Sequence, residues 1–340
     1  MLKETVKSLS ELYGISGREN EVRDYIISEI KDYADYSVDP LGNLIVFKKG
    51  AETPKNKVML DAHMDEVGFI VTFITDGGLL RFANAGGINT KSFLGRAVRV
   101  GKNKIPGVVG LVPVHLVDKA KSRSIPDKDS LYIDIGASTK EEALEYVKPG
   151  DSVYFDSDYV EFGENRVKCR ALDDRAGCAI LVEMIKSDLA YDMYFTFTVQ
   201  EEIGTRGAQA AAFTVAPDYA ICVETTTASD IPGVENEKQV CLLGKGAVVS
   251  FMDRSTLYGR ELFENAFKLA GEHGIKVQTK TVVAGGNNAG AIHKSRGGVK
   301  VLTVSVPCRY LHSPSCVIDF SDVEESYKLI KLLAEEYANA

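Results

Sequence analysis

Five short segments of the chain concentrate histidine, aspartate and glutamate, the side chains that commonly bind divalent metal ions. Each segment alone also fits an ordinary structural role, such as a histidine at a strand end or a solvated pair of glutamates. The segments are Asp61-Ala62-His63-Met64-Asp65, Leu172-Asp173-Asp174, Gln200-Glu201-Glu202-Ile203-Gly204, Cys222-Val223-Glu224-Thr225 and Tyr310-Leu311-His312-Ser313.

The apolar run from Phe195 to Val199 leads almost directly into two adjacent carboxylates, Glu201 and Glu202. Burying two carboxylates side by side is costly unless a cation receives them. A bound pair of metal ions would meet that cost. Imidazole and carboxylate ligands without thiolate favour zinc, cobalt or manganese over iron–sulfur or copper.

The cysteines do not add to this set of ligands. They show no CxxC pairing and lie among apolar or small residues, so we expect them to be reduced and buried. They are Cys169, Cys178, Cys222, Cys241, Cys308 and Cys316.

Alternating helices and strands are expected to position the segments, because open α/β sheets gather ligand-binding groups at the carboxyl ends of their strands. Two helices broken at Gly14 to Gly17 begin the chain, and a hairpin follows them. Strands are predicted at 57–62, 193–200, 219–224 and 299–306. Helices are predicted at 174–185, 260–273 and 319–338, the last N-capped at Ser321.

A different composition occupies residues 68 to about 158, where short β-rich runs are separated by glycines. This pattern is typical of a small β-barrel or sandwich. The sequence therefore predicts an α/β domain built from residues 1–67 and 161–340, interrupted by an inserted β domain at 68–160.

Charge and hydropathy exclude some classes of partner. The net charge of −8 would repel phosphate backbones and anionic membranes, which argues against nucleic acid. No run approaches the roughly 18 uncharged residues needed to span a bilayer, and the N-terminal stretch lacks an apolar signal region. We expect a cytoplasmic protein with no membrane partner.

Five motifs, DAHMDEVGF, ALDDRAG, VQEEIGTRGA, GGNNAGAIH and PCRYLHSP, follow one another along the chain. In this order and spacing they resemble the tetrahedral and glutamyl aminopeptidases, metallopeptidase family forty-two, some members of which are labelled endoglucanases. The resemblance covers nearly the whole chain. It implies a zinc-peptidase-like fold with a largely parallel sheet, an inserted barrel or PDZ-like domain, and removal of N-terminal residues from short peptides with two divalent ions.

The resemblance also implies roles for individual residues. His63 and Glu224 would hold one ion, Glu202 and His312 the other, and Asp173 would bridge the two. Asp65 would accept the far ring N–H of a metal-bound histidine, and Glu201 would be the general base. Glu202 or a metal ion would recognise the free α-amino group of the substrate. The inserted domain would build dimers and, from them, a tetrahedral dodecamer.

Two positions depart from the pattern of many relatives. Glu224 stands where many have aspartate, although the longer carboxylate can also bind a metal ion. Gly285-Gly286-Asn287-Asn288 stands where relatives often have Gly-Gly-Thr-Asp. Asn288 either alters amino-group recognition and the tuning of the site, or caps a helix that starts at Ala289.

Three alternatives remain open from the sequence. A glycosidase could use Glu201 and Asp173, but it would leave His63 and His312 without a role. A metal amidase or deacylase would use the same chemistry on N-acyl compounds. A non-catalytic assembly or metal-storing protein would keep the ligands without turnover.

The preference for a first residue is not determined by these motifs. A pocket for acidic side chains would need a buried arginine or lysine, and Arg309 and Lys294 are candidates by their proximity to the motifs.

Overall fold

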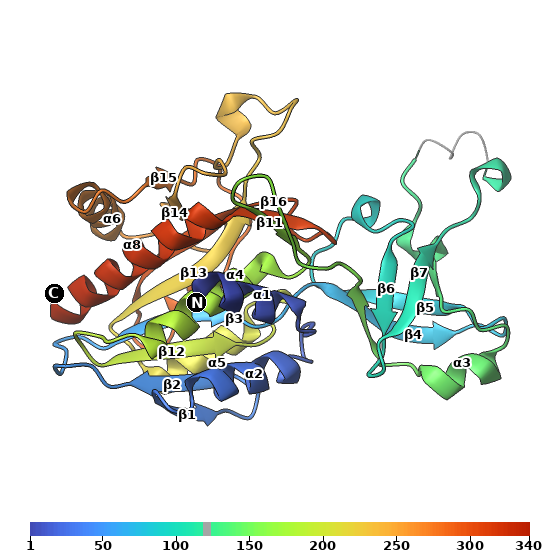
Figure 1. The fold of residues 1–340 in the computed structure, drawn as a ribbon, viewed down its shortest axis with the longest axis horizontal. Coiled ribbons are helices and arrows are strands. Elements are labelled where there is room, and N and C mark those ends of the chain that lie inside the picture. Colours follow the sequence, from blue (N-terminus) through green and yellow to red (C-terminus); the bar gives the residue numbers. More distant parts are fainter. Residues whose placement is uncertain (118–123) are drawn as a thin grey trace.

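The computed structural model describes residues 1–117 and 124–340, and the part of the inserted segment at 118–123 lies outside the described residues. Two bodies are visible, a large α/β part and a smaller β-barrel at one end of an elongated molecule (Figure 1). The helices are α1 (Leu2–Glu11), α2 (Asn20–Ile30), α3 (Lys140–Tyr146), α4 (Leu172–Lys186), α5 (Arg206–Val215), α6 (Arg260–Glu272), α7 (Ala289–Ile292) and α8 (Phe320–Asn339).

The large sheet has the strand order β1-β2-β12-β3-β13-β16-β17-β11-β10, with β14 paired to β16 and β15 paired to β14. Its strands are β1 (Asp35–Val38), β2 (Leu44–Lys48), β3 (Val58–His63), β10 (Val160–Phe162), β11 (Arg166–Cys169), β12 (Met193–Thr198), β13 (Tyr219–Thr227), β14 (Ala247–Val249), β15 (Val277–Thr279), β16 (Lys300–Arg309) and β17 (Cys316–Asp319).

The four central strands β12, β3, β13 and β16 run parallel, whereas the strands on both flanks join antiparallel. The predicted α/β class with a mixed, largely parallel sheet is therefore confirmed. Because parallel strands end at the same edge, the residues that follow β12 and β3 lie beside the C-terminal halves of β13 and β16.

Helix α4 lies at the centre of the α/β core. Nearly all of its residues are buried, and it packs against β3, β13 and β16 on one side and α1 on the other. Its apolar residues from Ala176 to Ile185 face several neighbouring elements, which is typical of a helix enclosed in a core. The buried helix fixes its own N-terminal turn, which contains Asp173 and Asp174, against the ends of the central strands.

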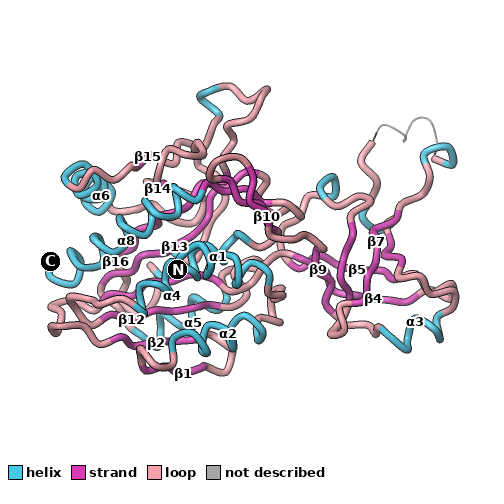
Figure 2. Tube along the Cα trace, in the orientation of Figure 1, coloured by secondary structure: helices cyan, strands magenta, loops and turns pink. Residues whose placement is uncertain are grey.

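The second body is a closed barrel with the strand order β4-β5-β8-β7-β6-β9 (Figure 2). Its strands are β4 (Gly68–Ile74), β5 (Leu80–Ala85), β6 (Ala97–Val100), β7 (Ile105–Gly110), β8 (Tyr132–Asp134) and β9 (Ser152–Phe155). Phe69 lies at its centre and makes edge-to-face contacts with Phe82, Phe93 and Phe155. The barrel thus has its own hydrophobic core, as the β-rich composition predicted.

One predicted helix cap is wrong. Helix α8 begins at Phe320, and the side chain of Asp319 accepts hydrogen bonds from the backbone N–H and the hydroxyl of Ser321, at 2.9 and 2.6 Å. Asp319 is therefore the N-cap. It precedes the first helical residue, a position at which aspartate is strongly preferred because its carboxylate accepts from free backbone N–H groups.

The six cysteines are buried and free, as expected. Over the described residues, no helix combines the length and the apolar character that crossing a bilayer requires.

Candidate metal centre

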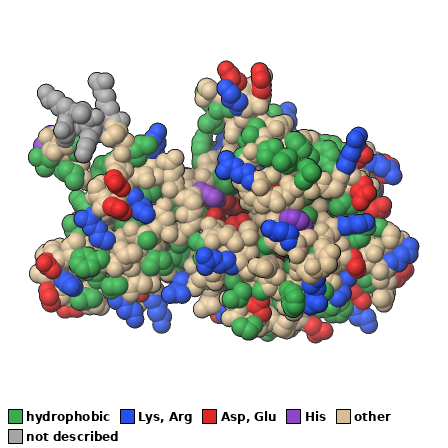
Figure 3. All heavy atoms as spheres, turned by 180° about the vertical axis from the view of Figure 1, so that it is seen from behind, with side chains coloured by type: hydrophobic (Ala, Val, Ile, Leu, Met, Phe, Trp, Pro, Cys, Tyr) green, Lys and Arg blue, Asp and Glu red, His purple; other side chains and the backbone are tan. Residues whose placement is uncertain are grey.

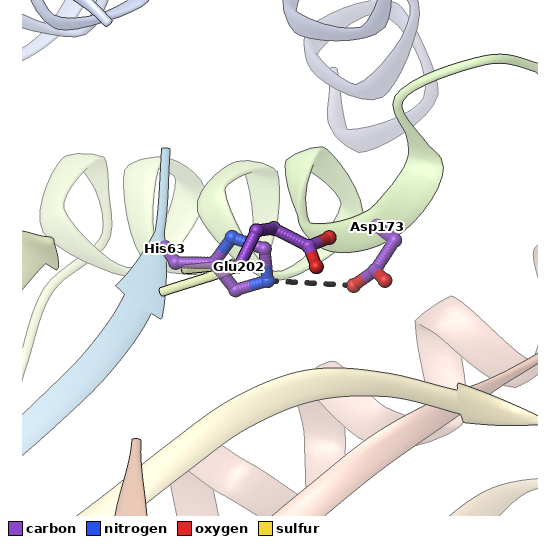
Figure 4. A group of neighbouring side chains, drawn as sticks. All are labelled: His63, Asp173 and Glu202. Carbon is purple, nitrogen blue, oxygen red and sulfur yellow. Dashed lines mark ion pairs between the residues drawn. The ribbon is translucent and has the colours of Figure 1, made fainter. Parts of the chain in front are cut away.

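The ends of the central strands bring four of the five acidic and histidine segments together. His63 is the last residue of β3, and Glu202 lies in the turn that follows β12. Glu224 is part of β13, and Asp173 lies in the first turn of α4. Figure 4 shows His63, Asp173 and Glu202 pointing toward one another from these separate elements. The fifth segment contributes His312 from the loop between β16 and β17.

Asp173 lies between two histidines. Its Oδ1 is 3.4 Å from Nε2 of His63, and its Oδ2 is 3.3 Å from Nε2 of His312. Nε2 of His63 is also 3.7 Å from Oε2 of Glu224, and Nε2 of His312 is 3.2 Å from Oε2 of Glu202. The structure thus brings all five predicted metal ligands into one cluster, with Asp173 in the middle.

The donor set fits divalent cations. Ligand atoms of His63, Asp173 and Glu202 lie within 4.8 Å of one another, and so do those of His63, Asp174 and Glu224. Atoms bound to one zinc ion at about 2.0–2.2 Å can be no farther apart than about 4.4 Å, so small adjustments suffice. Oε1 of Glu224 and Oδ2 of Asp174 are buried without a hydrogen-bond partner. Buried carboxylate oxygens of this kind are costly unless a cation is near them.

The charges of the cluster point to the same conclusion. Burial raises the pKa values of Glu224 and Asp174 well above their ordinary range. Burial acts on Asp173 in the same direction, but hydrogen bonds from His312 and His63 outweigh it and lower the pKa of Asp173. Carboxylates this close together cannot all ionise unless positive charge compensates them.

Glu201 lies beside the cluster and belongs to neither group of ligand atoms. Burial raises its pKa to about 8, His63 opposes this rise, and the charge of Glu202 adds to it. A carboxyl group whose pKa lies near neutrality can both accept and return a proton, as a general base and acid must.

Asp65 contacts His63 through both its backbone and its carboxylate. Nδ1 of His63 lies 2.9 Å from the backbone carbonyl oxygen of Asp65 and 3.4 Å from its carboxylate. The carboxylate accepts the hydroxyl of Ser16 at 2.6 Å and the backbone N–H groups of Glu201 and Glu202 at 2.9 and 3.1 Å. The carboxylate therefore connects Ser16 to the turn that carries Glu201 and Glu202.

The barrel also reaches the site. Nδ1 of His312 lies 2.8 Å from the backbone carbonyl oxygen of Gly87, in the loop that follows β5. This contact fixes the ring so that Nε2 faces Asp173 and Glu202. The inserted domain therefore takes part in orienting one of the two histidines.

Asn288 occupies the N-cap position of α7, but its side chain makes no capping hydrogen bond, so the alternative in which it caps the helix through its side chain is not what the structure has. The backbone N–H of Ala289 donates to the side chain of Asn287 at 2.8 Å. Asn288 is fully buried, and its Nδ2 donates to Asp61 at 2.7 Å and to Thr198 at 2.8 Å. The side chain of Asn288 points to Asp61 instead of the helix, because its amide donates to this buried carboxylate, two residues before His63.

Of the two predicted specificity residues, Arg309 is held elsewhere by an ion pair with Asp230 at 2.7 Å, and Lys294 is exposed.

Sequence reasoning also missed two residues near the cluster. Asp174 is adjacent to the predicted ligand Asp173, and that adjacency was the available signal. Lys280 follows the three-residue strand β15 and lines the same cavity as His63 and Glu224. No motif surrounds it.

Comparisons with known proteins identify the family of the chain. Residues 42–329 match the model of the M42 glutamyl aminopeptidase family. The chain is 40% identical over 328 residues to a putative aminopeptidase of Acetivibrio thermocellus, a match that covers 96% of each chain.

Two solved structures share the fold. An aminopeptidase from the archaeon Desulfurococcus kamchatkensis superposes with a TM-score of 0.93 at 33% identity, over 98% of this chain and 94% of that one. The TET1 peptidase of Pyrococcus horikoshii, described as assembling into a tetrahedron or a large octahedral shell, superposes with a TM-score of 0.86 at 38% identity, over 99% and 100%. The chain therefore belongs to the M42 glutamyl aminopeptidase family and is a peptidase.

Proposed function

We propose that this peptidase is an aminopeptidase that uses two divalent ions, zinc, cobalt or manganese, to remove N-terminal residues from short peptides. The observation that carries the proposal is the position of Asp173, with one carboxylate oxygen facing His63 and the other facing His312. A carboxylate whose two oxygens face two different imidazoles is placed to contact two ions at once, as a two-metal site would use it.

His63 and Glu224 would hold one ion, Glu202 and His312 the other, and Asp173 would contact both. When bound, the ions supply Lewis acidity, which lowers the pKa of a water molecule and polarises the scissile carbonyl. The unpartnered oxygen of Glu224 supports this assignment because it is otherwise buried without compensation.

Glu201 carries the proton. Its carboxylate accepts a proton from the attacking water and later returns it to the leaving amine. Asp65 positions this carboxylate, because it accepts the N–H groups of both Glu201 and Glu202 and so fixes the base and a ligand through one side chain. Ser16 in turn holds Asp65 with a hydrogen bond of 2.6 Å.

Restriction to N-termini requires recognition of a free α-amino group. Glu202, whose Oε2 is 3.2 Å from His312, would provide a carboxylate for this contact together with a nearby ion. An N-acetylated peptide should then be cleaved far more slowly than the same peptide with a free amino group. Equal rates would contradict this role.

Self-association is part of the proposal. The related TET1 peptidase is described as a dodecamer and as assembling into a tetrahedron, which supports self-association of this chain. The expected route is that the barrel builds dimers and, from them, a dodecamer. Sedimentation that finds only a fully active monomer would contradict it. The cytoplasmic location stays a prediction.

One experiment tests the hydrolytic mechanism. The protein is treated with a chelator, dialysed, and assayed on aminoacyl-nitroanilides before and after addition of zinc, cobalt or manganese. We expect activity to disappear on chelation and to return with at least one of the three ions. Full activity without bound metal would overturn the proposal, and cleavage of N-acyl substrates alone would identify a deacylase instead.

A further inference from the structure

Three cavities adjoin one another from the metal centre outward. The first, of about 150 Å³, contains His63, and the second, of about 410 Å³, shares Glu201 and His312 with it. The third, the outer cavity, has a volume of about 900 Å³ and shares Thr205 and Lys294 with the second. Figure 3 shows histidine and carboxylate side chains at the bottom of a hollow between the two bodies, with lysine and arginine side chains around it. The cavities thus form one groove that leads from the cluster to the surface of α5.

The sign of the charge changes along this groove. Glu201 and Glu202 line its inner part. The outer cavity is lined by Lys294, Arg206 and Arg296, all of them exposed. The chain as a whole carries a net charge of −8, so three cations around one cavity are a local reversal of the overall charge.

Asp39 is the one carboxylate that lines the outer cavity among the described residues. Its Oδ1 accepts the backbone N–H groups of Leu41, Gly42 and Asn43 at 2.9, 2.9 and 3.0 Å, and its Oδ2 accepts the side-chain amide of Asn43 at 2.6 Å. These bonds hold the turn between β1 and β2 and satisfy the carboxylate there. Over residues 1–117 and 124–340, none of the three cations forms an ion pair with a protein carboxylate.

Arg296 is held in position by Phe213 of α5. Its Nε donates to the backbone carbonyl oxygen of Phe213 at 2.6 Å, and its guanidinium carbon lies 4.1 Å from the centre of the Phe213 ring. A guanidinium group has five N–H donors, so the four on its two Nη atoms remain for a ligand. This planar arrangement matches the two oxygens of a carboxylate.

A short peptide has the same separation of charge as the groove. Its N-terminal ammonium group would lie beside the acids and its C-terminal carboxylate beside the cations, and complementary charges of this kind orient a ligand. We propose that the outer cavity binds the C-terminal carboxylate of short peptides through Arg206, Lys294 and Arg296. The proposal rests on the aminopeptidase function proposed above and adds a preference for substrate length.

The chain itself limits how long such a peptide can be. Four peptide units join Glu202 to Arg206, so their Cα atoms are at most about 15 Å apart. An extended peptide covers this distance with about four to five residues, at about 3.3–3.6 Å each. Peptides of about four to six residues should therefore place their C-terminal carboxylate among the cations, whereas much longer ones extend past them.

The test compares kcat/KM for leucyl-oligoalanines, from dipeptide to decapeptide, with a free C-terminal carboxylate and as C-terminal amides. Leucyl-nitroanilide, which has no leaving peptide, is the reference for each variant. The metal-loaded wild type should cleave the pentapeptide acid about 10-fold better than its amide, as two exposed charge pairs would provide, mainly through a lower KM. The ratio should approach one for the decapeptide, and added salt should lower it.

The variants assign this preference to the outer cavity. The double variant Arg206→Gln, Arg296→Gln should reduce the acid-to-amide ratio of the pentapeptide to about one, because the paired charges are lost. Arg296→Glu should favour the amide. Arg96→Gln, at an exposed position in the barrel, is the matched control and should keep the wild-type ratio.

A binding measurement provides a readout that does not depend on turnover. Calorimetry on the Glu201→Gln protein should show that tetraalanine binds more tightly than tetraalanine amide. The difference should vanish when Arg206→Gln and Arg296→Gln are added to this protein. Thermal unfolding at the same temperature as the parent would show that the added substitutions leave the fold intact.

The outcomes separate the two proposals. If neither the nitroanilide nor any peptide is cleaved at any metal loading, the aminopeptidase function fails. If acids and amides are cleaved equally at every length, or if the double variant keeps the wild-type ratio, only the carboxylate site is overturned. A pentapeptide amide that regains the full rate through a glutamate in its leaving part would overturn the assignment to the C-terminus.

Discussion

Asp173 faces His63 with one oxygen and His312 with the other, so a single carboxylate links two halves of the candidate site. Glu201 lies next to these groups without being one of the clustered ligands. In the proposed mechanism Asp173 holds cations and Glu201 moves protons, so substitutions at the two positions should have different effects.

We expect Glu201→Gln to keep the wild-type metal content and to lower kcat by a factor of about 10³ or more, because an amide cannot accept the proton of water. Elemental analysis combined with a nitroanilide assay measures both quantities. Asp173→Ala is the contrasting variant and should lose metal as well as activity. A Glu201→Gln enzyme that turns over at the wild-type rate would show that the base is another residue.

Asp322 provides a pH-dependent contribution to stability away from the metal site. Its carboxylate is fully buried and accepts the N–H groups of Gly244 and Gly246, at 2.7 and 2.6 Å. Burial raises its pKa from 3.8 to about 6, so between these values the folded chain holds a proton that the unfolded chain releases. The free energy of unfolding should therefore fall by up to about 3 kcal/mol as the pH rises from 3.8 to 6, and this contribution should stay lost above that.

Denaturant unfolding of wild type and Asp322→Asn across this pH range, with chelator present throughout, measures that contribution. The asparagine variant should lack it, whereas Asp32→Asn, at an exposed position, should follow the wild type. Parallel curves for wild type and Asp322→Asn would contradict the prediction.

Single residues differ in how well the sequence predicts them. The five predicted metal ligands, His63, Asp173, Glu202, Glu224 and His312, stood in motifs, and the structure gathers them in one cluster. Lys280 and Asn288 lie in no informative pattern, because their surroundings come from segments distant in the chain. Asn288 hydrogen-bonds to Asp61, and Lys280 hydrogen-bonds to Ala284 inside a cavity formed by several loops. Local periodicity carries no signal for such contacts.

At the scale of elements, the turn after β12 is held between α5 and the hairpin of β1 and β2. Asn43 accepts the N–H of Val199 at 2.9 Å and donates to the carbonyl oxygen of Gly207 at 3.0 Å. The turn that this contact supports carries Glu201 and Glu202. The position of Glu201 and Glu202 therefore depends on the close packing of helix α5 against Asn43 and Val199.

Gly207→Ala should destabilise the fold by about 1–3 kcal/mol, because its Cβ would overlap the side chain of Asn43 and the backbone of Val199. Thermal unfolding measures the effect. The matched control is Gly271→Ala in α6, where a Cβ meets open space and should stabilise the helix by up to about 1 kcal/mol. Equal melting temperatures for the two variants would contradict the argument.

Helices α1, α2, α4, α6 and α8 and the central strands were predictable because their apolar residues recur with a clear period. Helices α3 and α5 were not predicted. Strand β16 continues three residues beyond the predicted end, to Arg309, because it pairs with β13 as far as Thr227 and Cys308. Among the strands of the large sheet that were not predicted, β10, β14 and β15 are the shortest. Each has three residues, too few to show a period, and each is fixed by its neighbours in the sheet.

At the scale of the whole molecule, the cluster joins the two halves of the α/β part to the barrel. His63 precedes the inserted domain, Asp173 follows it, and His312 contacts Gly87 within it. Cations bound there would connect all three parts. The composition of the inserted segment predicted the insertion. The sequence gave no indication of the Gly87 contact, because every residue has a backbone carbonyl and residue type does not show which one contacts His312.

Removal of metal should lower the stability of the whole chain. With free metal at 100 to 1,000 times its dissociation constant, binding contributes about 2.7 to 4.1 kcal/mol. Scanning calorimetry before and after chelation should show a lower melting temperature, restored when the ion is added back. A melting temperature unaffected by chelator would mean that the buried carboxylates are satisfied without a cation.

The order of these residues along the chain has a consequence during translation. The ribosome incorporates His63 long before His312, because synthesis proceeds from the N-terminus. A nascent polypeptide therefore lacks one imidazole until most of it has been made. Proteolytic capacity would thus arise only late in synthesis, so a growing chain could not trim the newly made proteins around it.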